Sequence, residues 1–505
     1  MIRYSLGAAN QMQGTIGAAS MVNAEGGNTT SSEISLVADL HYRLLNRYNV
    51  NLSLKTEGSS QYGKDNPFSI FPTVGVAWNL DKEAFLRDKE WAELLKLRFA
   101  YGVTGRLPNV TNLLSVTYAT AQDGYMGNSY SYMDKFAYDN LHEERTTQYN
   151  YGMDWTLFGG RFSGEANYYK GTTEGLLLKE NMSTSTGFAE RYVNFGSLQN
   201  KGWELGFTVI PVKLADNFQW KVYFSISRNK GKLLSMPERL ANSDNKYTEP
   251  YGYGSFRAKL EKGSVVGGFF GLKALGVYAR DEDAVVKDFN GNIVYNADGT
   301  PKKLTFRDGS TFSGGDMIYE DINHDGVIND LDVVQIGDAN VGYFGLFRHD
   351  ITYKQWALGL AFYYSLGQDV INGMRYSTEN MEGSNNQATS IQRRWRKQGD
   401  ITDMPRAIDK AARNYEASTR WVEDASYLKL KEISLTYSFK REWLKKIHLN
   451  QLSAFVTGTN VFTWSKYKGI DPEIGLTSGK LVKIGIDHSN TAPPIQIMFG
   501  IRAQF

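Results

Sequence analysis

The 505-residue sequence predicts an all-β protein, an antiparallel transmembrane barrel with long loops at one end. Segments of about ten residues alternate between apolar and polar side chains, as strands do when one face meets lipid and the other a wet lumen. The links between these segments alternate between short and long. Glycine contributes 50 residues and aromatic residues 13% of the chain, an enrichment that favours β architecture.

The first predicted hairpin shows the alternation clearly. Apolar residues occupy every second position from Leu36 to Leu44, polar residues fill the positions between them, and a tight turn at Asn46-Arg47 leads to the return strand. Comparable runs follow along the chain. The thirteen predicted strands span residues 35–44, 48–55, 70–80, 95–104, 149–157, 162–170, 203–211, 218–227, 344–353, 356–366, 427–437, 452–462 and 495–505.

The links between the predicted strands fall into two classes that alternate along the chain. Outer-membrane barrels have short periplasmic turns and long extracellular loops, so the long links are expected outside the cell, with 228–343 the longest. Residues 81–94 link two strands at the end of the barrel that carries the short turns, and they are expected to hold a brief amphipathic helix. The other short links are 46–47, 158–160, 212–217, 354–355 and 440–449, and the long ones are 105–143, 171–201, 228–343, 367–426 and 463–494.

Composition excludes several classes of function. Lys plus Arg total 56 against 54 Asp plus Glu, so bulk charge gives no reason to expect nucleic-acid binding. The absence of Cys removes disulfides, thiolate metal sites and Cys nucleophiles, and the six His are scattered without ligand spacing. We find no catalytic constellation, no signal peptide at the N-terminus and no apolar run long enough for a membrane helix. A soluble β-sandwich or propeller is the alternative, but strand length and one-sided loops favour the barrel.

The last predicted strand, 495–505, places six apolar residues on one face. It resembles the terminal strand by which barrels are recognised for outer-membrane assembly, with Phe499, Ile501, Ala503 and Phe505 as the signal; a buried edge strand is the alternative. Thirteen is odd, whereas single-chain bacterial barrels close with even counts, because an open edge leaves backbone groups unpaired in lipid. We therefore expect the C-terminal part of a larger barrel, of about 22 strands, unless 265–278 is a further strand.

Several local motifs occur in one order along the chain. They are Asn194-Phe195-Gly196 with Lys201-Gly202-Trp203-Glu204-Leu205, the block from Gly315 to Gly326 with Ile336-Gly337-Asp338, the block from Arg420 to Lys431, Gly458-Thr459-Asn460-Val461-Phe462-Thr463, and Asp471-Pro472-Glu473. Together they resemble the SusC/RagA-like branch of the TonB-dependent receptors. The resemblance covers the whole chain but only the C-terminal half of a family member, without signal peptide, β-sandwich domain, TonB box, plug or first barrel strands.

The resemblance implies energy-dependent import of a nutrient, most often an oligosaccharide and sometimes a peptide, across a Gram-negative outer membrane. The implied partners are a SusD-like surface lipoprotein, outer-membrane lipid and the TonB complex, which acts through a plug and TonB box. The alternative is a truncated barrel that binds glycans or matrix as a structural protein and does not transport. A secreted β-rich glycan hydrolase ranks last.

One loop has the spacing of a calcium site. The pattern D-x-N-x-D-G offers oxygen ligands at alternating positions with Gly at the sharp turn, although Asp332 stands where a bidentate Glu is usual. No cofactor is required by the resemblance, so calcium is the one ion expected. The alternative is an Asx-rich turn held by its own hydrogen bonds. The candidate ligands are Asp321, Asn323, Asp325, Val327 through its carbonyl, Asn329 and Asp332.

Two further features are open to two interpretations each. Aromatic residues in the loops 118–132 and 247–256 could stack on sugar rings, although membrane-interface girdles use the same residues. The basic run Arg393, Arg394, Trp395 and Arg396 could face the lumen or a surface partner, or could be a solvated loop. No residue is assigned to the substrate from sequence.

Overall fold

The structure is a computed structural model of the chain. It describes residues 2–6, 21–26, 32–106, 117–121, 130–135, 138–188, 190–214, 217–236, 246–250, 255–381, 386–408, 412–445, 448–473, 484–489 and 491–504.

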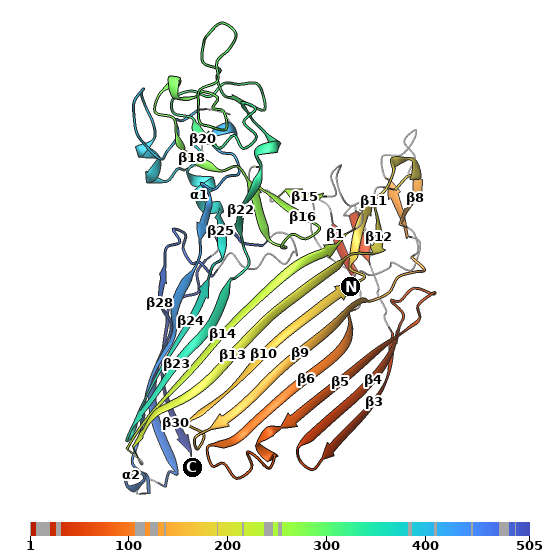
Figure 1. Cartoon of the computed structure of the whole chain (residues 1–505), viewed down its shortest axis with the longest axis vertical. Coiled ribbons are helices and arrows are strands. Elements are labelled where there is room, and N and C mark those ends of the chain that lie inside the picture. The colour runs from red at the N-terminus through yellow and green to blue at the C-terminus, as the bar shows by residue number, and fades with distance from the viewer. Residues whose placement is uncertain are drawn as a thin grey trace.

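Thirteen strands form one curved antiparallel sheet, and each pairs with its neighbour in chain order (Figure 1). This confirms all thirteen predicted strands, most of them longer than the alternation indicated. Within the described residues the first strand pairs only with the second and the last only with the twelfth, so the sheet is open. The strands are β3 (Glu33–Leu44), β4 (Tyr48–Ser59), β5 (Phe68–Asn79), β6 (Ala92–Arg106), β9 (Glu144–Leu157), β10 (Phe162–Glu174), β13 (Ser197–Leu214), β14 (Phe218–Ser235), β23 (Tyr343–Tyr353), β24 (Trp356–Leu366), β27 (Tyr427–Ser438), β28 (Gln451–Ser465) and β30 (Gln496–Gln504).

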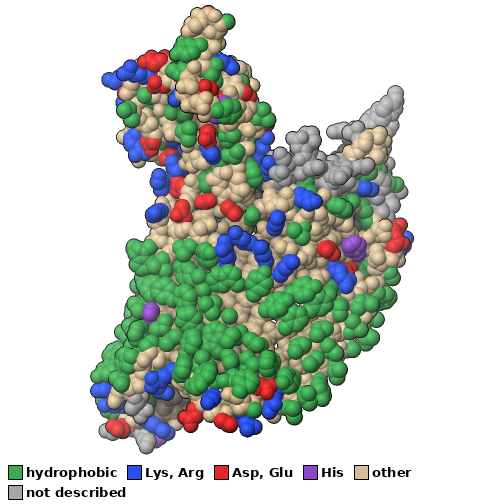
Figure 2. Space-filling model, in the orientation of Figure 1, with side chains coloured by type: hydrophobic (Ala, Val, Ile, Leu, Met, Phe, Trp, Pro, Cys, Tyr) green, Lys and Arg blue, Asp and Glu red, His purple; other side chains and the backbone are tan. Residues whose placement is uncertain are grey.

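The two faces of the sheet differ as the alternation predicts. Apolar side chains such as Leu36, Leu40 and Phe499 are exposed on the outer face. Figure 2 shows a continuous apolar area over the lower part of the sheet. The inner face carries charged groups: Arg98 donates two hydrogen bonds to Asp154, at 2.8 and 2.6 Å. An apolar outer face and a polar inner face are what a membrane barrel requires.

A glycine makes room for this inner ion pair. Gly152 lies between Arg98 and Asn167 in the strand register, and the Arg98 guanidinium crosses it to reach the Asn167 carbonyl oxygen at 3.2 Å. A Cβ at position 152 would lie 2.8 Å from both partners. Side-chain packing on the inner wall therefore requires glycine here.

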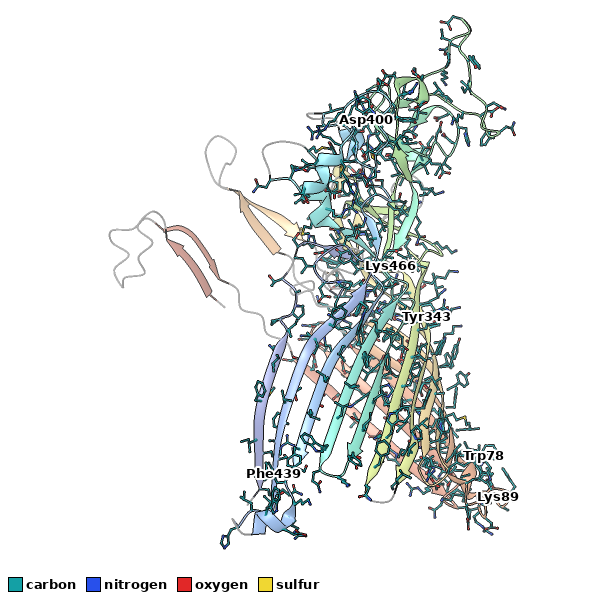
Figure 3. The ribbon with its side chains drawn as sticks, turned by 90° about the vertical axis from the view of Figure 1, so that its left-hand side faces the viewer. Trp78, Lys89, Tyr343, Asp400, Phe439 and Lys466 are labelled. Carbon is teal, nitrogen blue, oxygen red and sulfur yellow. The ribbon has the colours of Figure 1, made fainter. Side chains whose placement is uncertain are left out.

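Short turns close one end of the sheet, where Trp78, Lys89 and Phe439 lie in Figure 3. In the link between β5 and β6 the expected amphipathic helix is only a three-residue 3₁₀ helix, η2 (Leu80–Lys82). Glu83 organises this turn, because its carboxylate accepts hydrogen bonds from Tyr48 Oη at 2.8 Å and Trp78 Nε1 at 2.9 Å. The link between β27 and β28 holds the short helix α2 (Arg441–Lys445).

At the opposite end three long links fold into one body, which we call the loop cap: the described residues of 246–342, 367–426 and 466–489. It stands above the sheet in Figure 1, with Asp400 near its far end and Tyr343 and Lys466 at its base in Figure 3. One core packs Trp421 with Phe256, Phe269 and Ile371, and a second packs Phe312 with residues from Leu272 to Ile328. The long links are therefore a folded unit with its own apolar interior.

Small sheets build this cap. A four-stranded sheet joins β15, β16, β17 and β22. In a second small sheet, β25 pairs with β26 of the same long link and with β29 of the third long link. The alternative barrel strand at 265–278 is wrong, because that segment supplies β17 and β18 to the cap. The cap elements are β15 (Lys246–Pro250), β16 (Arg257–Glu261), β17 (Gly268–Gly271), β18 (Ala274–Val277), η6 (Asp281–Asp283), β19 (Thr305–Phe306), β20 (Met317–Tyr319), β21 (Val327–Ile328), η7 (Asp330–Asp332), β22 (Val334–Asp338), β25 (Asp369–Asn372), α1 (Gly373–Thr378), η8 (Thr389–Arg393), η9 (Ala412–Asn414), β26 (Val422–Asp424) and β29 (Ile486–Asp487).

The remaining elements are three hairpins and one short turn. β1 (Ile2–Leu6) pairs with β2 (Met21–Gly26), β7 (Thr117–Ala121) with β8 (Tyr130–Lys135), and β11 (Leu177–Asn181) with β12 (Glu190–Asn194). A 3₁₀ turn, η4 (Thr184–Thr186), lies between β11 and β12. In the described part of the chain, no helix has the length and apolar character needed to cross a membrane.

Candidate functional site

A buried carboxylate joins two of the long links at the centre of the loop cap. Asp316, from the Gly315 motif block, is fully buried. Arg406 donates to its two oxygens at 2.9 and 3.1 Å, Arg413 Nε donates at 3.2 Å, and Asn414 Nδ2 donates at 3.2 Å. Since Asp316 belongs to the link after β14 and its partners to the link after β24, this motif residue connects two separate loops.

The second motif block makes a similar connection. Trp421 is fully buried, and the guanidinium of Arg420 lies over its ring at 4.8 Å. Arg375, at the start of α1, donates to both Glu379 and Glu423, and Glu423 also accepts from the backbone N–H of Lys468 at 2.9 Å. The ion pairs thus brace the second long link internally, and the Glu423 carboxylate and the Trp421 core, which includes Ile486, hold it against the third.

The third connection ties the cap to the barrel sheet. Lys429 on β27 is only 2% exposed, and its Nζ donates to Asp471 at 3.0 Å and to Glu473 at 2.6 Å. A buried ammonium requires this kind of compensation. The motif residues that carry the family resemblance therefore fix the loops in place, and none of those named in these three connections is left to hold a ligand.

The predicted calcium loop is held by its own hydrogen bonds. Asp321 Oδ2 accepts from the Gly326 N–H at 2.9 Å, and Asp325 Oδ1 accepts from the Val327 N–H at 2.7 Å. Asp332 is fully buried, and its two oxygens accept from Ile322 N–H at 2.8 Å and Asn329 N–H at 2.9 Å. This is the arrangement expected of an Asx-rich turn.

Some features of the same loop suit a cation. The donor set consists of oxygens, which calcium prefers. Asp321 Oδ1 is buried without a hydrogen-bond partner, and burial, together with the nearby Asp332 and Asp325 carboxylates, raises the pKa of Asp321. The described residues contain no group of three or more His, Cys, Asp or Glu side chains arranged to hold a metal ion. Calcium binding therefore stays a prediction.

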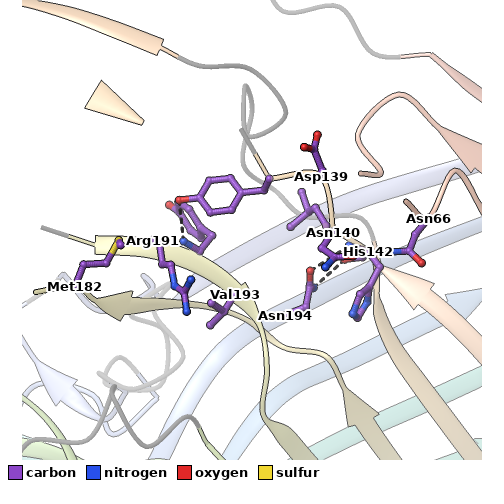
Figure 4. A pocket seen from close by; sticks show the side chains of 11 residues that line it. Asn66, Asp139, Asn140, His142, Met182, Arg191, Val193 and Asn194 are labelled. Carbon is purple, nitrogen blue, oxygen red and sulfur yellow. Dashed lines mark hydrogen bonds between the residues drawn. The ribbon is translucent and has the colours of Figure 1, made fainter. Parts of the chain in front are cut away.

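A cavity of about 670 Å³ opens at the rim of the sheet, apart from the cap; we call it the rim pocket (Figure 4). Three links meet there, after β4, β6 and β10, and Figure 4 shows Asn66, His142 and Arg191 approaching from one link each. Sequence reasoning missed this pocket. Its lining residues are Asn66, Tyr138, Asp139, Asn140, Leu141, His142, Met182, Arg191, Tyr192, Val193 and Asn194.

Backbone hydrogen bonds hold the walls of the rim pocket. Asn194, the first residue of the Asn194-Phe195-Gly196 motif, accepts from the His142 N–H at 3.0 Å and donates to the carbonyls of His142 at 2.9 Å and Gly175 at 3.0 Å. Gly175 has a φ of +67°, and a Cβ there would lie 2.6 Å from the His142 ring. The motif asparagine therefore positions one wall of the cavity.

The other residues predicted from sequence are spread over the molecule. Phe499, Ile501 and Ala503 are exposed on one face of β30, and Phe505 lies outside the described residues, so the assembly signal stays a prediction. Phe256, at the end of the aromatic loop 247–256, is buried in the cap core and cannot stack on a sugar. The side chains of 247–254 and of 118–132 lie outside what the structure describes.

Two residues of the basic run at 393–396 have different environments in the structure. Arg393 pairs with Asp403 at 3.3 Å on the cap surface, whereas Trp395 packs against Gly315 and donates from Nε1 to the carbonyl of Ala279 at 3.0 Å. The tryptophan is thus a packing residue and Arg393 belongs to a solvated loop.

Comparison with known proteins gives consistent results. Residues 3–299 match the family described as TonB dependent receptor-like, β-barrel. The TonB-dependent receptor P3 of Formosa agariphila is 28% identical, over 96% of this chain and 47% of its own length, and SusC of Bacteroides thetaiotaomicron is 27% identical, over 94% and 44%. A solved structure of the RagAB peptide importer in an open-open state superposes with a TM-score of 0.78 at 19% identity, covering 98% of this chain and 49% of its own. The chain spans about half the length of the curated relatives it matches.

Proposed function

Because the chain belongs to the TonB dependent receptor-like β-barrel family, we propose that it forms barrel wall and outer loops of a transporter that imports a nutrient across the outer membrane. The thirteen-stranded sheet with an apolar outer face supports this proposal most directly. Barrels of this family lie in the outer membrane, and the family consists of transport proteins and not of enzymes. The short-turn end then faces the periplasm and the loop cap faces outward.

We propose that the substrate is an oligosaccharide. The rim pocket supports this choice, because its lining combines aromatic and apolar side chains with several polar groups that can hydrogen-bond to hydroxyls. A peptide is the second candidate, and the RagAB structure, described as that of a peptide importer, favours it. The two substrate classes can be separated by direct binding measurements.

The proposed partners follow from the same arrangement. A SusD-like surface lipoprotein would dock at the outward end, where the cap gives it a folded surface. The TonB complex would supply energy from the periplasm, acting through a plug domain outside these 505 residues. We also propose a calcium ion at the Asp321–Asp332 loop, where Asp321, Asp325 and Asp332 would supply carboxylate oxygens and rigidify the cap.

An uptake experiment tests the proposed function. Cells that express the intact receptor are given a radiolabelled oligosaccharide mixture or a peptide mixture, with a strain lacking this gene and a strain lacking TonB as controls. We expect oligosaccharide uptake that disappears in both control strains. Binding at the cell surface without uptake would instead support a structural, glycan-binding barrel, and uptake that persists without the gene would refute the proposal.

A further inference from the structure

We propose that the rim pocket binds one sugar ring of a neutral oligosaccharide, with Arg191 and Asp139 hydrogen-bonded to its hydroxyl groups. This inference rests on the proposed import of an oligosaccharide and assigns residues to it. The cavity, about 670 Å³, lies within the roughly 300–1,000 Å³ usual for ligand sites. It is at the loop end of the sheet, where a substrate arrives first under the proposed orientation.

The charges around the pocket favour a neutral ligand. Among its lining residues only Arg191 is a permanent cation and only Asp139 is an acid, so neither sign of charge dominates the lining. The Asp139 carboxylate also lies 3.8 Å from Lys64 Nζ, in a pair that is largely exposed and therefore weak. A purely anionic or cationic ligand would be attracted by one of them and repelled by the other. The remaining polar side chains, such as Asn66 and Asn140, are uncharged amides that both donate and accept.

The donor and acceptor types favour hydroxyl groups. A guanidinium only donates hydrogen bonds and an ionised carboxylate only accepts them, whereas a hydroxyl does both and can therefore bond with either. Tyr138 and Tyr192 add aromatic surface next to these groups, with their rings 6.2 Å apart at 84°. A sugar ring presents hydroxyls at its edge and apolar C–H groups on its face, which matches both kinds of surface.

The pocket is formed before any ligand arrives. The Gly63 N–H donates to the Leu141 carbonyl at 2.7 Å, the Asp65 N–H to the Asp139 carbonyl at 3.1 Å, and the Tyr192 N–H to Tyr138 Oη at 3.0 Å. With the bonds of the Asn194 side chain, these contacts join all three links. A site held in this way loses less conformational entropy on binding, which raises affinity.

A peptide would use the same region differently. Peptides that dock beside a strand pair through the main chain, and side chains then add specificity. Binding of that kind would depend on the backbone edge of β12 and would tolerate the loss of the Arg191 guanidinium. Removal of individual side chains therefore separates the two modes.

The test uses the intact receptor in detergent and isothermal titration calorimetry. The probes are maltohexaose, cellohexaose, mannohexaose, galactohexaose and xylohexaose, with a mixture of decapeptides as the comparison. The variants are Arg191→Met and, in a different link, Asn66→Ala. The matched control is Arg393→Met, an arginine on the cap surface that is far from the pocket in sequence and pairs with Asp403.

We expect at least one hexasaccharide to bind. Arg191→Met should raise its dissociation constant about ten- to one hundred-fold, because a hydrogen bond from a charged donor is lost. Asn66→Ala should weaken binding about three- to tenfold. Arg393→Met should leave it unchanged, and an unchanged shift in gel mobility on boiling shows that each variant is folded.

The outcomes separate the two proposals. If the wild type binds a hexasaccharide and both pocket variants bind it equally well, the rim pocket inference is overturned while the proposed function stands. If the wild type binds the decapeptides and no saccharide, the proposed substrate class fails and the inference fails with it. Binding to none of these probes also overturns the inference.

Discussion

Replacement of Asp316 by alanine tests whether the loop cap depends on its buried ion pairs. The substitution removes the carboxylate that compensates Arg406 and Arg413, whose side chains are 28% and 16% exposed. Breaking a buried ion pair by removing one partner typically destabilises by about 3–5 kcal/mol. Because water can reach both arginines in part, we expect about 3 kcal/mol, the lower end of that range. This corresponds to a roughly 150-fold larger population of opened cap.

Proteolysis of intact receptor in outer-membrane vesicles measures this population. When a segment closes faster than it is cut, the cleavage rate follows the equilibrium fraction that is open. Proteinase K should therefore cut the cap of Asp316→Ala about 150-fold faster than that of the wild type, while the sheet keeps its gel mobility shift on boiling. The control is Asp403→Ala, because the Arg393–Asp403 pair is 64% and 72% exposed and exposed pairs contribute little. A cleavage rate for Asp316→Ala within threefold of this control would refute the reasoning.

Three further predictions concern the cap and the inner wall. Calcium added to chelator-treated receptor should slow cleavage near Asp321, and Asp321→Asn should remove that response; an identical rate with and without calcium would contradict the proposed site. Burial, with smaller effects of Asp424 and Asp338, raises the pKa of Asp369. The folded cap then holds this proton more tightly than the unfolded chain. The stability contribution of Asp369 is therefore full below the ordinary Asp pKa and is lost as pH rises through the raised value, so Asp369→Asn should flatten the pH dependence of cap cleavage above the ordinary Asp pKa; a profile identical to that of the wild type would argue against this. Gly152→Ala should lower the temperature at which the sheet unfolds in detergent by displacing the Arg98 guanidinium, whereas Gly75→Ala, whose Cβ meets Asn51 at an ordinary 3.7 Å, should not; equal effects would disprove the packing argument.

The strands could be predicted from sequence because their signal is local. Lipid on one face and water on the other select alternating side chains within each run of about ten residues, so Leu36 to Leu44 reveals a strand without reference to any partner. The order of pairing was also accessible, since neighbouring antiparallel strands joined by short turns pair with each other. The motif residues were recognisable too, but their roles were not. Asp316, Glu423 and Lys429 meet partners that lie 42 to 98 residues away in the chain, and no spacing rule connects them.

The sequence by itself therefore determined the thirteen strands, their two faces and the alternation of short and long links. Only the tertiary structure decided that three long links share one interior, because their apolar residues follow no fixed period and find each other through packing. The rim pocket also appears only in the tertiary structure, because Asn66, His142 and Arg191 come from links that are separated by entire strands. The local alternation reflects whether each residue faces lipid or water. A site built from several loops instead depends on the distances between those loops, which are set only when the strands between them pair.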